Sequence, residues 1–441
     1  MSNVQTLNSI CSLIVDCPHS TPVWTDYGYV VLRNQNIKNG KLDLSNPSFT
    51  DEAHFNGRNR RAKPSFGDIV ITREAPMGDV CMIPDGLECC LGQRQVLLRP
   101  NPEVVSPRFI LYALQSEFVQ HQISWNEGTG STVSNLRIPL LESLNVPTPP
   151  IEEQRAIAHI LGTLDDKIEL NRKQNETLEA MARALFNAWF VDFEPVRAKM
   201  EGRWVRGQSL PGLPAHLFDL FPDKLIESEL GEIPEGWRCG TLSNLTNYLN
   251  GYAFKTKDWQ SSGHPVVKIG NVKPGLIEVS SSSYVSPETV VGLERFKLSR
   301  GDLLVGMTGY VGETGLVPSI DPPAYLNQRV GKIGTKCGLT DLGFVYCLVR
   351  NQDYKIYAEL KSHGSAQANV SGADLMAYPC VLPTTKVLDL FNERLYSIIR
   401  DILEKHDESV SLAQLRDILL PKLISGQLSV KDVKYFIERA T

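Results

Sequence analysis

Two long stretches of the chain carry apolar residues at alternating spacings of three and four, the pattern of a helix with one apolar face. In the first stretch these positions are Leu161, Leu164, Ile168, Asn171, Asn175, Leu178, Ala182 and Leu185. In the second they are Leu395, Ile398, Ile402, Lys405, Ser409, Leu412 and Leu419. Residues 151–194 contain no proline, and the prolines of TPPIEEQ stand where a helix start tolerates them. We predict two long helices, the first of about 40 residues and about 60 Å.

Outside these helices the apolar residues form short runs rich in Val, Ile and Tyr, which Gly, Asn and Pro interrupt. Such runs predict strands, and they lie at 29–32, 68–72, 94–99, 265–269, 302–307 and 329–333. A helical pattern near 109–120 and another near 344–360 accompany them. The fold class that we predict is therefore α+β, with mixed α/β modules joined by long helices.

The chain contains an internal repeat, because its two halves match in the same order at a shift of 234 or 235 residues. At 235 the matches are Thr6/Thr241, Leu7/Leu242, Asn36/Asn271, Gly40/Gly275, Gln93/Gln328, Arg94/Arg329 and Phe109/Phe344. At 234 they are Gly67/Gly301, Asp68/Asp302, Gly78/Gly312, Gly130/Gly364, Ser131/Ser365 and Pro149/Pro383. The helical seams also match at 234, for example Leu161 with Leu395 and Leu185 with Leu419. Each repeat is thus one module followed by one long helix.

This organisation predicts six segments. They are a first module (1–148), a central long helix (149–194), a connector rich in Gly, Pro and charge (195–230), a second module (231–383), a C-terminal long helix (384–428) and a tail (429–441). We expect the two helices to pair as an antiparallel coiled coil that holds the modules apart, whereas a parallel pair would place the modules side by side. Alternatively, each seam packs as a core stripe against a neighbouring sheet. Asn171 and Asn175 either fix the register of the pair or mark a solvated gap.

Composition and charge narrow the class of protein. The chain has no apolar run of about 18 residues that would predict a membrane span, and its N-terminus lacks the features of a secretory signal. We expect a cytoplasmic protein, with its nine cysteines as reduced core thiols, since none forms a C-x-x-C pair. The formal charge of −5 and the pI near 6.0 are not those of a protein that coats nucleic acid by charge alone.

The motifs of common enzyme classes are missing from the sequence. DPPAY (321–325) approaches the (D/N)PP(Y/F) motif of adenine methyltransferases, but it has an extra Ala324 and no FxGxG segment accompanies it. PDG and PDK lack the partners of a nuclease site, and there is no GxxxxGK[ST] for ATP. Histidines such as His54 and His264 have no nucleophile or second ligand at a useful spacing. We therefore predict a non-catalytic chain without a metal site.

The stretch NAWFVDFEPVRAKMEG (187–202), preceded by TLDDKIELNRKQNETLEAMARALF, closely resembles the central region of the specificity subunits of type I restriction-modification enzymes. GEIPEGW (231–237) and LLPKLISGQL (419–428) are similar to the same family. With the twofold repeat, the resemblance covers essentially the whole chain. The first module departs from the pattern because it has no GxIPxGW lead-in.

The resemblance implies that each module is a target-recognition domain for one half of a split double-stranded DNA site. It implies that the helices serve as a ruler and as the docking surface for two methyltransferase (modification) subunits. S-adenosylmethionine, ATP, magnesium and the restriction/translocase subunits would then belong to partner chains, and this chain would carry no cofactor. The complex would be found in the cytoplasm of a bacterium or archaeon.

Candidate DNA contacts come from polar residues at strand ends and in turns. Thr72 and Arg73 stand at one strand end, and Thr308 and Tyr310 follow the corresponding strand of the second module. The pairs Gln93–Arg94 and Gln328–Arg329 suit adenine and guanine edges. However, their recurrence in two modules that should read different sequences favours a phosphate or structural role.

Three further groups are candidates, each with a simpler alternative. The basic run GRNRRAK (57–63) is either a local DNA patch or a solvated loop, and Arg33 and Lys268 are either DNA contacts or solvated strand ends. Turns 128–136 and 363–375 offer amides and hydroxyls for phosphates, or they cap the next segment. The candidates in these groups are Arg58, Arg60, Arg61, Arg33, Lys268, Ser131, Thr132 and Ser365.

Aromatic residues near the end of the central helix are candidates for partner docking. Phe186, Trp189 and Phe190, beside Ala180, form an apolar face that we expect to point outward and to bind the modification subunits. The competing function is a two-module interaction scaffold that binds a protein or a carbohydrate rather than DNA, and the acidic pI is its main support.

Overall fold

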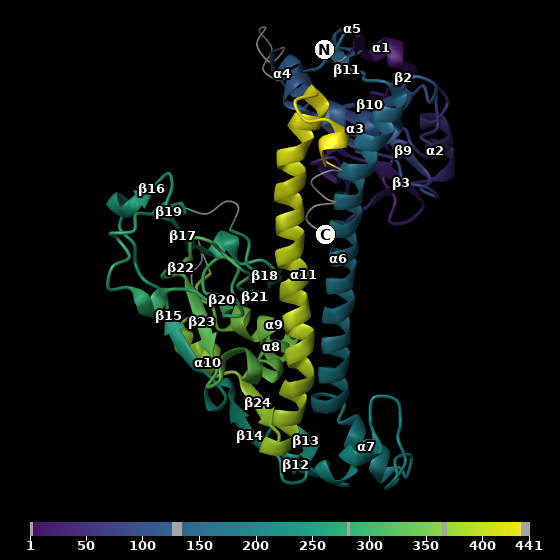
Figure 1. Ribbon diagram of the computed structural model, residues 1–441. Helices are drawn as coiled ribbons and strands as arrows, with labels where there is room; N and C mark the ends of the chain where they lie inside the picture. Colours follow the sequence, from purple (N-terminus) through teal and green to yellow (C-terminus); the bar gives the residue numbers. More distant parts are fainter. Residues whose placement is uncertain (1–2, 126–134, 280–282, 364–367, 434–441) are drawn as a thin grey trace. The chain divides into compact units, whose positions relative to one another are not determined.

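The computed structural model describes residues 3–125, 135–279, 283–363 and 368–433 (Figure 1). The chain divides into two compact units, one formed by 1–168 with 411–441 and the other by 169–410. Each unit contains one module and one part of each long helix.

The two predicted long helices are present as α6 (Ile151–Phe190) and α11 (Thr385–Ser425). In the first unit, Arg416 of α11 forms an ion pair with Asp165 of α6 at 2.7 Å. In the second, Nδ2 of Asn171 donates to the Lys405 carbonyl at 3.3 Å, and Nδ2 of Asn175 donates to the Ile402 carbonyl at 3.1 Å. Since the partner number falls as the α6 number rises, the helices pack antiparallel in the second unit, as predicted.

The first unit contains two main sheets besides two pairs of short strands. The larger has the order β2 (Cys11–Asp16), β10 (Gln95–Pro100), β7 (Ile69–Arg73), β8 (Met77–Met82) and is antiparallel. The smaller has the order β6 (Ser48–Thr50), β3 (Tyr29–Leu32), β9 (Cys89–Leu91), with β3 and β9 parallel. The other elements are β1 (Val4–Thr6), α1 (Leu7–Ile10), a 3-10 helix (Asn34–Asn36), β4 (Ile37–Lys38), β5 (Lys41–Leu42), α2 (Glu52–Arg58), α3 (Pro107–Gln115), α4 (Glu117–Trp125), α5 (Ile138–Glu142) and β11 (Asn145–Pro147).

Strand β7 shows how the core of this unit forms. All five of its residues are buried, because the sheet is covered on both faces. Ile69 and Ile71 belong to a cluster with Phe109 of α3 and Leu161 of α6, whereas Val70 packs in a second cluster with residues of β9. The alternation of side chains along a strand accounts for this division.

The second unit repeats this plan. One sheet has the order β15 (Asn247–Asn250), β23 (Val330–Gly334), β20 (Leu303–Gly306), β21 (Thr314–Leu316), β18 (Gly275–Leu276), and the other β16 (Trp259–Gln260), β19 (Ser283–Val285), β17 (His264–Val267), β22 (Tyr325–Leu326). The other elements are α7 (Glu194–Met200), β12 (Leu225–Ser228), β13 (Gly231–Pro234), β14 (Arg238–Thr241), α8 (Gly343–Val349), α9 (Gln352–Leu360), α10 (Gly372–Met376), β24 (Pro379–Leu382) and the 3-10 helices Ala215–Leu220, Leu242–Asn244, Thr256–Asp258, Ile269–Asn271, Glu294–Phe296 and Gly338–Asp341.

Strand register confirms the internal repeat. Val31 of β3 lies opposite Cys90 of β9, and the residues 235 positions later, Val266 of β17 and Tyr325 of β22, lie opposite each other in the same parallel arrangement. The six predicted strands are all present, within one or two residues of the predicted bounds. Each of the two predicted module helices is instead a pair, α3 with α4 and α8 with α9. The break in the first pair falls at Ser116, whose backbone is extended.

The connector between the modules is folded. Its α7 and 3-10 helix place Trp204, Leu213 and Leu217 in the hydrophobic core of the second unit. The motif GEIPEGW begins with β13, the second strand of a hairpin, and its Trp237 is buried. Strand β14, the repeat counterpart of β1, follows this motif.

All nine cysteines are free. The prediction that they are core thiols is wrong for Cys337, which is exposed, because it lies in the turn before α8 rather than in a strand or helix. Burial raises the pKa of Cys89 to about 12 and that of Cys90 to about 11. In the described part of the chain, no helix combines the length and the apolar character needed to cross a bilayer.

Candidate nucleic-acid interface

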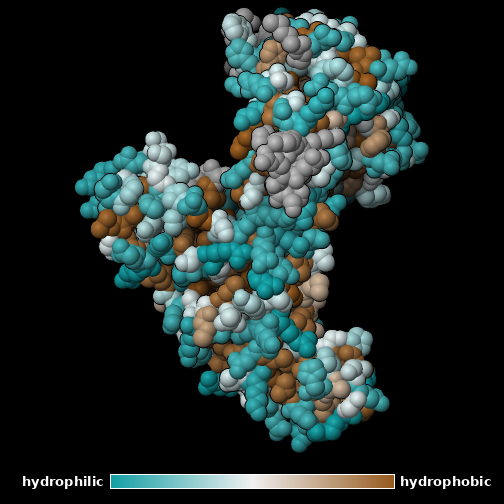
Figure 2. Space-filling view, viewed as in Figure 1, coloured by the Kyte–Doolittle hydropathy of each residue, from teal (hydrophilic) through white to brown (hydrophobic). Residues whose placement is uncertain are grey.

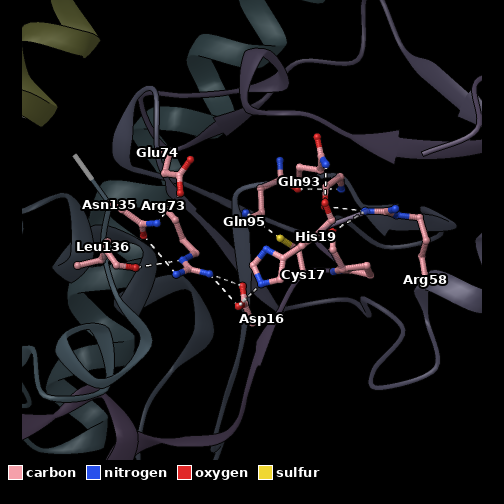
Figure 3. Close-up of polar contacts among 12 residues, drawn as sticks. Asp16, Cys17, His19, Arg58, Arg73, Glu74, Gln93, Gln95, Asn135 and Leu136 are labelled. Carbon is pink, nitrogen blue, oxygen red and sulfur yellow. Dashed lines mark hydrogen bonds and ion pairs between the residues drawn. The ribbon is translucent and has the colours of Figure 1, made fainter. Parts of the chain in front are cut away.

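Arg73 ends strand β7 inside the first unit rather than at its surface. Its Nη1 donates to both carboxylate oxygens of Asp16 at 2.7 Å, its Nε donates to the Leu136 carbonyl at 3.0 Å, and its Nη2 donates to Asn135 at 3.2 Å (Figure 3). The side chain is 10% exposed. The prediction of an exposed DNA contact is therefore wrong for Arg73, because the fold brings a carboxylate and a carbonyl to its guanidinium.

Arg58 is likewise a structural residue. Its guanidinium donates to four backbone carbonyls, those of Leu91, Gly92, Ser20 and Pro18, at 2.7–3.1 Å. Figure 3 shows it pointing toward the two loops that carry His19 and Gln93. Burial lowers the pKa of Arg58. Arg58 is therefore not an exposed cation of the basic run, since its donors tie α2 to the loops after β2 and β9; its DNA contact stays a prediction.

The threonines at the two equivalent strand ends are also buried. Oγ1 of Thr72 accepts a hydrogen bond from the Asp79 amide at 3.0 Å, and Oγ1 of Thr308 donates to Oδ1 of Asn369 at 2.6 Å. The prediction that these threonines are exposed to DNA is wrong, because each hydroxyl is buried and hydrogen-bonded to another segment of its module. Tyr310, two residues further, is 62% exposed and stays a candidate.

The two Gln–Arg pairs take up different environments. Gln93 donates through Nε2 to the His19 carbonyl at 2.6 Å, and Arg94, with φ of +65°, pairs with Glu74 at 3.3 Å. Gln328 and Arg329 are exposed. In the first module the Arg94 carbonyl accepts a hydrogen bond from the Arg73 amide. In the second module the Arg329 carbonyl accepts one from the Met307 amide. The backbone of the two arginines thus has a structural role, while the DNA contacts of the Gln and Arg side chains stay predictions.

Arg60 and Arg61 are exposed on the wall of a pocket of about 400 Å³ that residues after β2 and α2 also line. Among the described residues, neither forms an ion pair. At a shift of 235, Arg60 matches Arg295, which is exposed and lies 4.8 Å from the centre of the Phe296 ring. Sequence reasoning missed Arg295, although the repeat offset alone points to it.

Arg33 and Lys268 lie in matching surroundings. The Arg33 guanidinium carbon lies 5.3 Å from the centre of the Trp24 ring, and Lys268 Nζ lies 3.8 Å from the centre of the Trp259 ring. The two tryptophans are also 235 residues apart, a match that sequence reasoning overlooked. Each module thus presents a cation over an indole at the end of its β3-type strand.

The predicted phosphate turns are only partly described. Ser131, Thr132 and Ser365 lie outside the described residues. Near the end of the second turn, Oγ of Ser371 accepts the Asp374 amide at 3.0 Å and so caps α10. This is the capping role that we gave as the alternative.

Phe186, Trp189 and Phe190 do not point outward. They are 3%, 1% and 7% exposed and pack inside the second unit. The Phe190 ring lies 4.8 Å from both the Phe344 and the Phe391 rings. The predicted exposed docking face is therefore wrong at these residues, because the module and α11 cover it.

The described residues contain no group of three or more His, Cys, Asp or Glu placed to hold a metal ion. In DPPAY, Ala324 and Tyr325 are buried, and Tyr325 belongs to β22, which pairs with β17. The motif therefore leads into a structural strand, as its interpretation as a proline turn implies.

Comparison with known proteins gives a consistent result. A family model described as the type I restriction modification DNA specificity domain matches residues 6–180 and 234–417. The HindI specificity subunit of Haemophilus influenzae is 26% identical over 401 residues, 82% of this chain and 86% of that protein. The EcoKI specificity subunit of Escherichia coli is 24% identical over 418 residues, 91% and 82% of the two chains. The S subunit structure from M. genitalium has a TM-score of 0.57 at 17% identity and covers 96% of this chain and 95% of that one, a likeness of fold.

Proposed function

The chain belongs to the type I restriction modification DNA specificity family, and from this premise we propose that its two modules each read one half of a split DNA target. As a member of this family, it is the non-catalytic DNA-recognition component of a type I restriction-modification system. None of the comparisons supports the alternative of a scaffold for a protein or carbohydrate ligand. We place its action in the cytoplasm, where its DNA target is accessible.

A split target is supported by the two modules sharing one strand arrangement while differing in their surface residues. The β3–β9 and β17–β22 pairs keep one register at a shift of 235. At the same shift, exposed Lys41 is replaced by Leu276 and exposed Arg61 by Phe296. Because base readout depends on side chains presented to the groove, one frame with two surfaces supports two different half-sites.

The twofold repeat also supports two modification subunits as partners. Met181 of α6 is 55% exposed in the second unit, and Leu415 of α11, its match at a shift of 234, is 45% exposed in the first. We infer that these equivalent positions make equivalent contacts with two copies of one partner. S-adenosylmethionine, ATP and magnesium then belong to the modification and restriction/translocase subunits.

The test is single-molecule methylation mapping of DNA from cells that express this chain with its neighbouring modification subunit. The control cells express the modification subunit alone. We expect a split, adenine-methylated motif only in the presence of this chain. An unchanged methylome from a complex shown to be assembled would refute DNA recognition and return the scaffold alternative.

A second arm assigns modules to half-sites. Arg61→Ala and Tyr310→Ala each remove one exposed side chain, from the first and the second module respectively. We expect each variant to relax or slow methylation through one half of the motif only. Changes in both halves from a single variant would contradict the assignment of one module to one half-site.

A further inference from the structure

One cation recurs at the same place in both modules, and its anchoring is the same in both. The Arg33 amide donates to Oδ1 of Asn36 at 2.9 Å, and the Lys268 amide donates to Oδ1 of Asn271 at 2.8 Å. Nδ2 of Asn36 donates to the Asp43 carbonyl at 2.9 Å, as Nδ2 of Asn271 does to the Glu278 carbonyl at 2.8 Å. The backbone of each cation is therefore held by a buried asparagine, 4% and 3% exposed.

Both side chains are positively charged and lie near an indole ring, but one carries a guanidinium and the other an ammonium group. Arg33 and Lys268 lie over Trp24 and Trp259 respectively. A guanidinium can contact a guanine edge with two parallel hydrogen bonds, whereas an ammonium acts as a point charge. A position that accepts either group therefore fits a phosphate better than a base.

Neither charge is neutralised by a carboxylate in the described part of the chain. Arg33 is exposed, and Nζ of Lys268 donates to the neutral hydroxyl of Ser283 at 2.6 Å. By contrast, Arg73 and Arg94 both have carboxylate partners within the first unit. An indole face holds a cation in place and leaves its charge free to attract an anion.

We propose that Arg33 and Lys268 are phosphate contacts, one in each module, which hold DNA in position without reading its sequence. This inference rests on the proposed function, because it takes double-stranded DNA as the ligand. It explains why a cation is retained at the same site of two modules that read different half-sites.

The experiment measures the salt dependence of DNA binding by the chain assembled with its modification subunit. The probes are a duplex that carries the mapped motif and a duplex that lacks it, between about 50 and 200 mM salt. The variants are Arg33→Gln and Lys268→Gln, with Arg33→Lys and Lys268→Arg as charge-preserving partners. Lys386→Gln is the matched control, because it removes an exposed charge at the start of α11, outside both modules.

We expect each Gln variant to lower the salt slope by about 0.9, to weaken binding to both duplexes by the same factor and to leave the methylated motif unchanged. The charge-preserving variants and Lys386→Gln should keep the wild-type slope. If a Gln variant does not fold, Arg33→Met or Lys268→Met keeps an apolar stem over the indole and removes the same charge.

Two results would overturn the inference. An unchanged slope with a lower melting temperature would reduce the cation to a packing role, and a changed half of the motif would make it a base contact. Failure of the wild-type complex to methylate a split motif would instead refute the proposed function itself.

Discussion

At the scale of single residues, arginines that are similar in sequence have opposite roles. Arg58 and Arg61 belong to one basic run, yet the first donates to four carbonyls and the second is exposed. Arg73 meets Asp16 and Leu136, which are 57 and 63 residues away. Residue type and local pattern do not reveal partners this far away in the sequence. Sequence reasoning could therefore propose cations but could not separate the buried, structural ones from the exposed ones.

Replacement of Arg73 should affect stability first. We expect Arg73→Ala to lower the free energy of unfolding by about 3 kcal/mol or more, because within the described residues the Asp16 carboxylate then keeps only the exposed His19 as an ion-pair partner. Chemical denaturation of the purified chain measures this loss. Arg61→Ala, an exposed arginine of the same module, should stay within about 0.5 kcal/mol of wild type.

The contrary result for Arg73 is also informative. Wild-type stability of Arg73→Ala, together with weaker binding to the mapped DNA motif, would show that the guanidinium leaves Asp16 to contact DNA. The structural role assigned to this ion pair would then be wrong.

At the scale of elements, the long helices were predictable because their period persists over many turns. The polar middle of the seam is real: Asn171 is completely buried, and its Nδ2 contacts Glu408 at 2.8 Å. What periodicity could not show is which part of the seam faces a helix and which part a module. Trp189 continues the same stripe and packs against Phe391 of α11, but it also packs against Phe221 of the connector. The end of the seam therefore contacts both the partner helix and another part of the second unit.

A carboxylate on α11 links this helix to its module within the second unit. Asp407 accepts hydrogen bonds from the amide and the hydroxyl of Ser319, at 2.9 and 2.7 Å, and from Nε of Arg300 at 2.7 Å. Burial by itself would raise the pKa of Asp407, but the donors of Ser319 and Arg300 outweigh it and lower the pKa.

This link should make stability depend on pH. Because the folded-state pKa lies below the unfolded value of about 3.9, the contribution of Asp407 is complete above that pH and is lost as the pH falls through the folded-state pKa. We expect Asp407→Asn to cost about 1–2 kcal/mol at pH 7, with a difference from wild type that shrinks below about pH 4. Denaturation curves at several pH values measure it.

The matched control is Asp401→Asn, a half-buried aspartate on the same helix that pairs only with Arg400, at 3.4 Å, in the described structure. It should change stability by less than about 0.5 kcal/mol at any pH. A difference for Asp407→Asn that persists undiminished at pH 3 would show that its carboxylate charge does not hold the contact.

At the scale of the whole molecule, the repeat offset predicted the order module, helix, module, helix. The error in the docking prediction arose because an apolar stripe looks the same in sequence whether a partner or the chain itself covers it. In the described residues, every hydrophobic cluster draws its members from one unit: Trp189 and Phe190 belong to a cluster of the second, and Ile71 to a cluster of the first.

Separate cores predict that damage to one unit spares the other. Trp189→Ala with Phe190→Ala should destabilise the second unit by several kcal/mol, since each truncation removes a fully packed ring and costs about 3–5 kcal/mol. Hydrogen exchange should then rise in β20 and β23 while β7 and β10 keep their protection.

The variant should also fail to assemble with modification subunits, through loss of the folded unit rather than loss of a contact surface. Met181→Ala separates the two causes, because an exposed side chain can weaken assembly while exchange stays at the wild-type level. Loss of protection in β7 and β10 of the double variant would instead show that both units unfold as one cooperative structure.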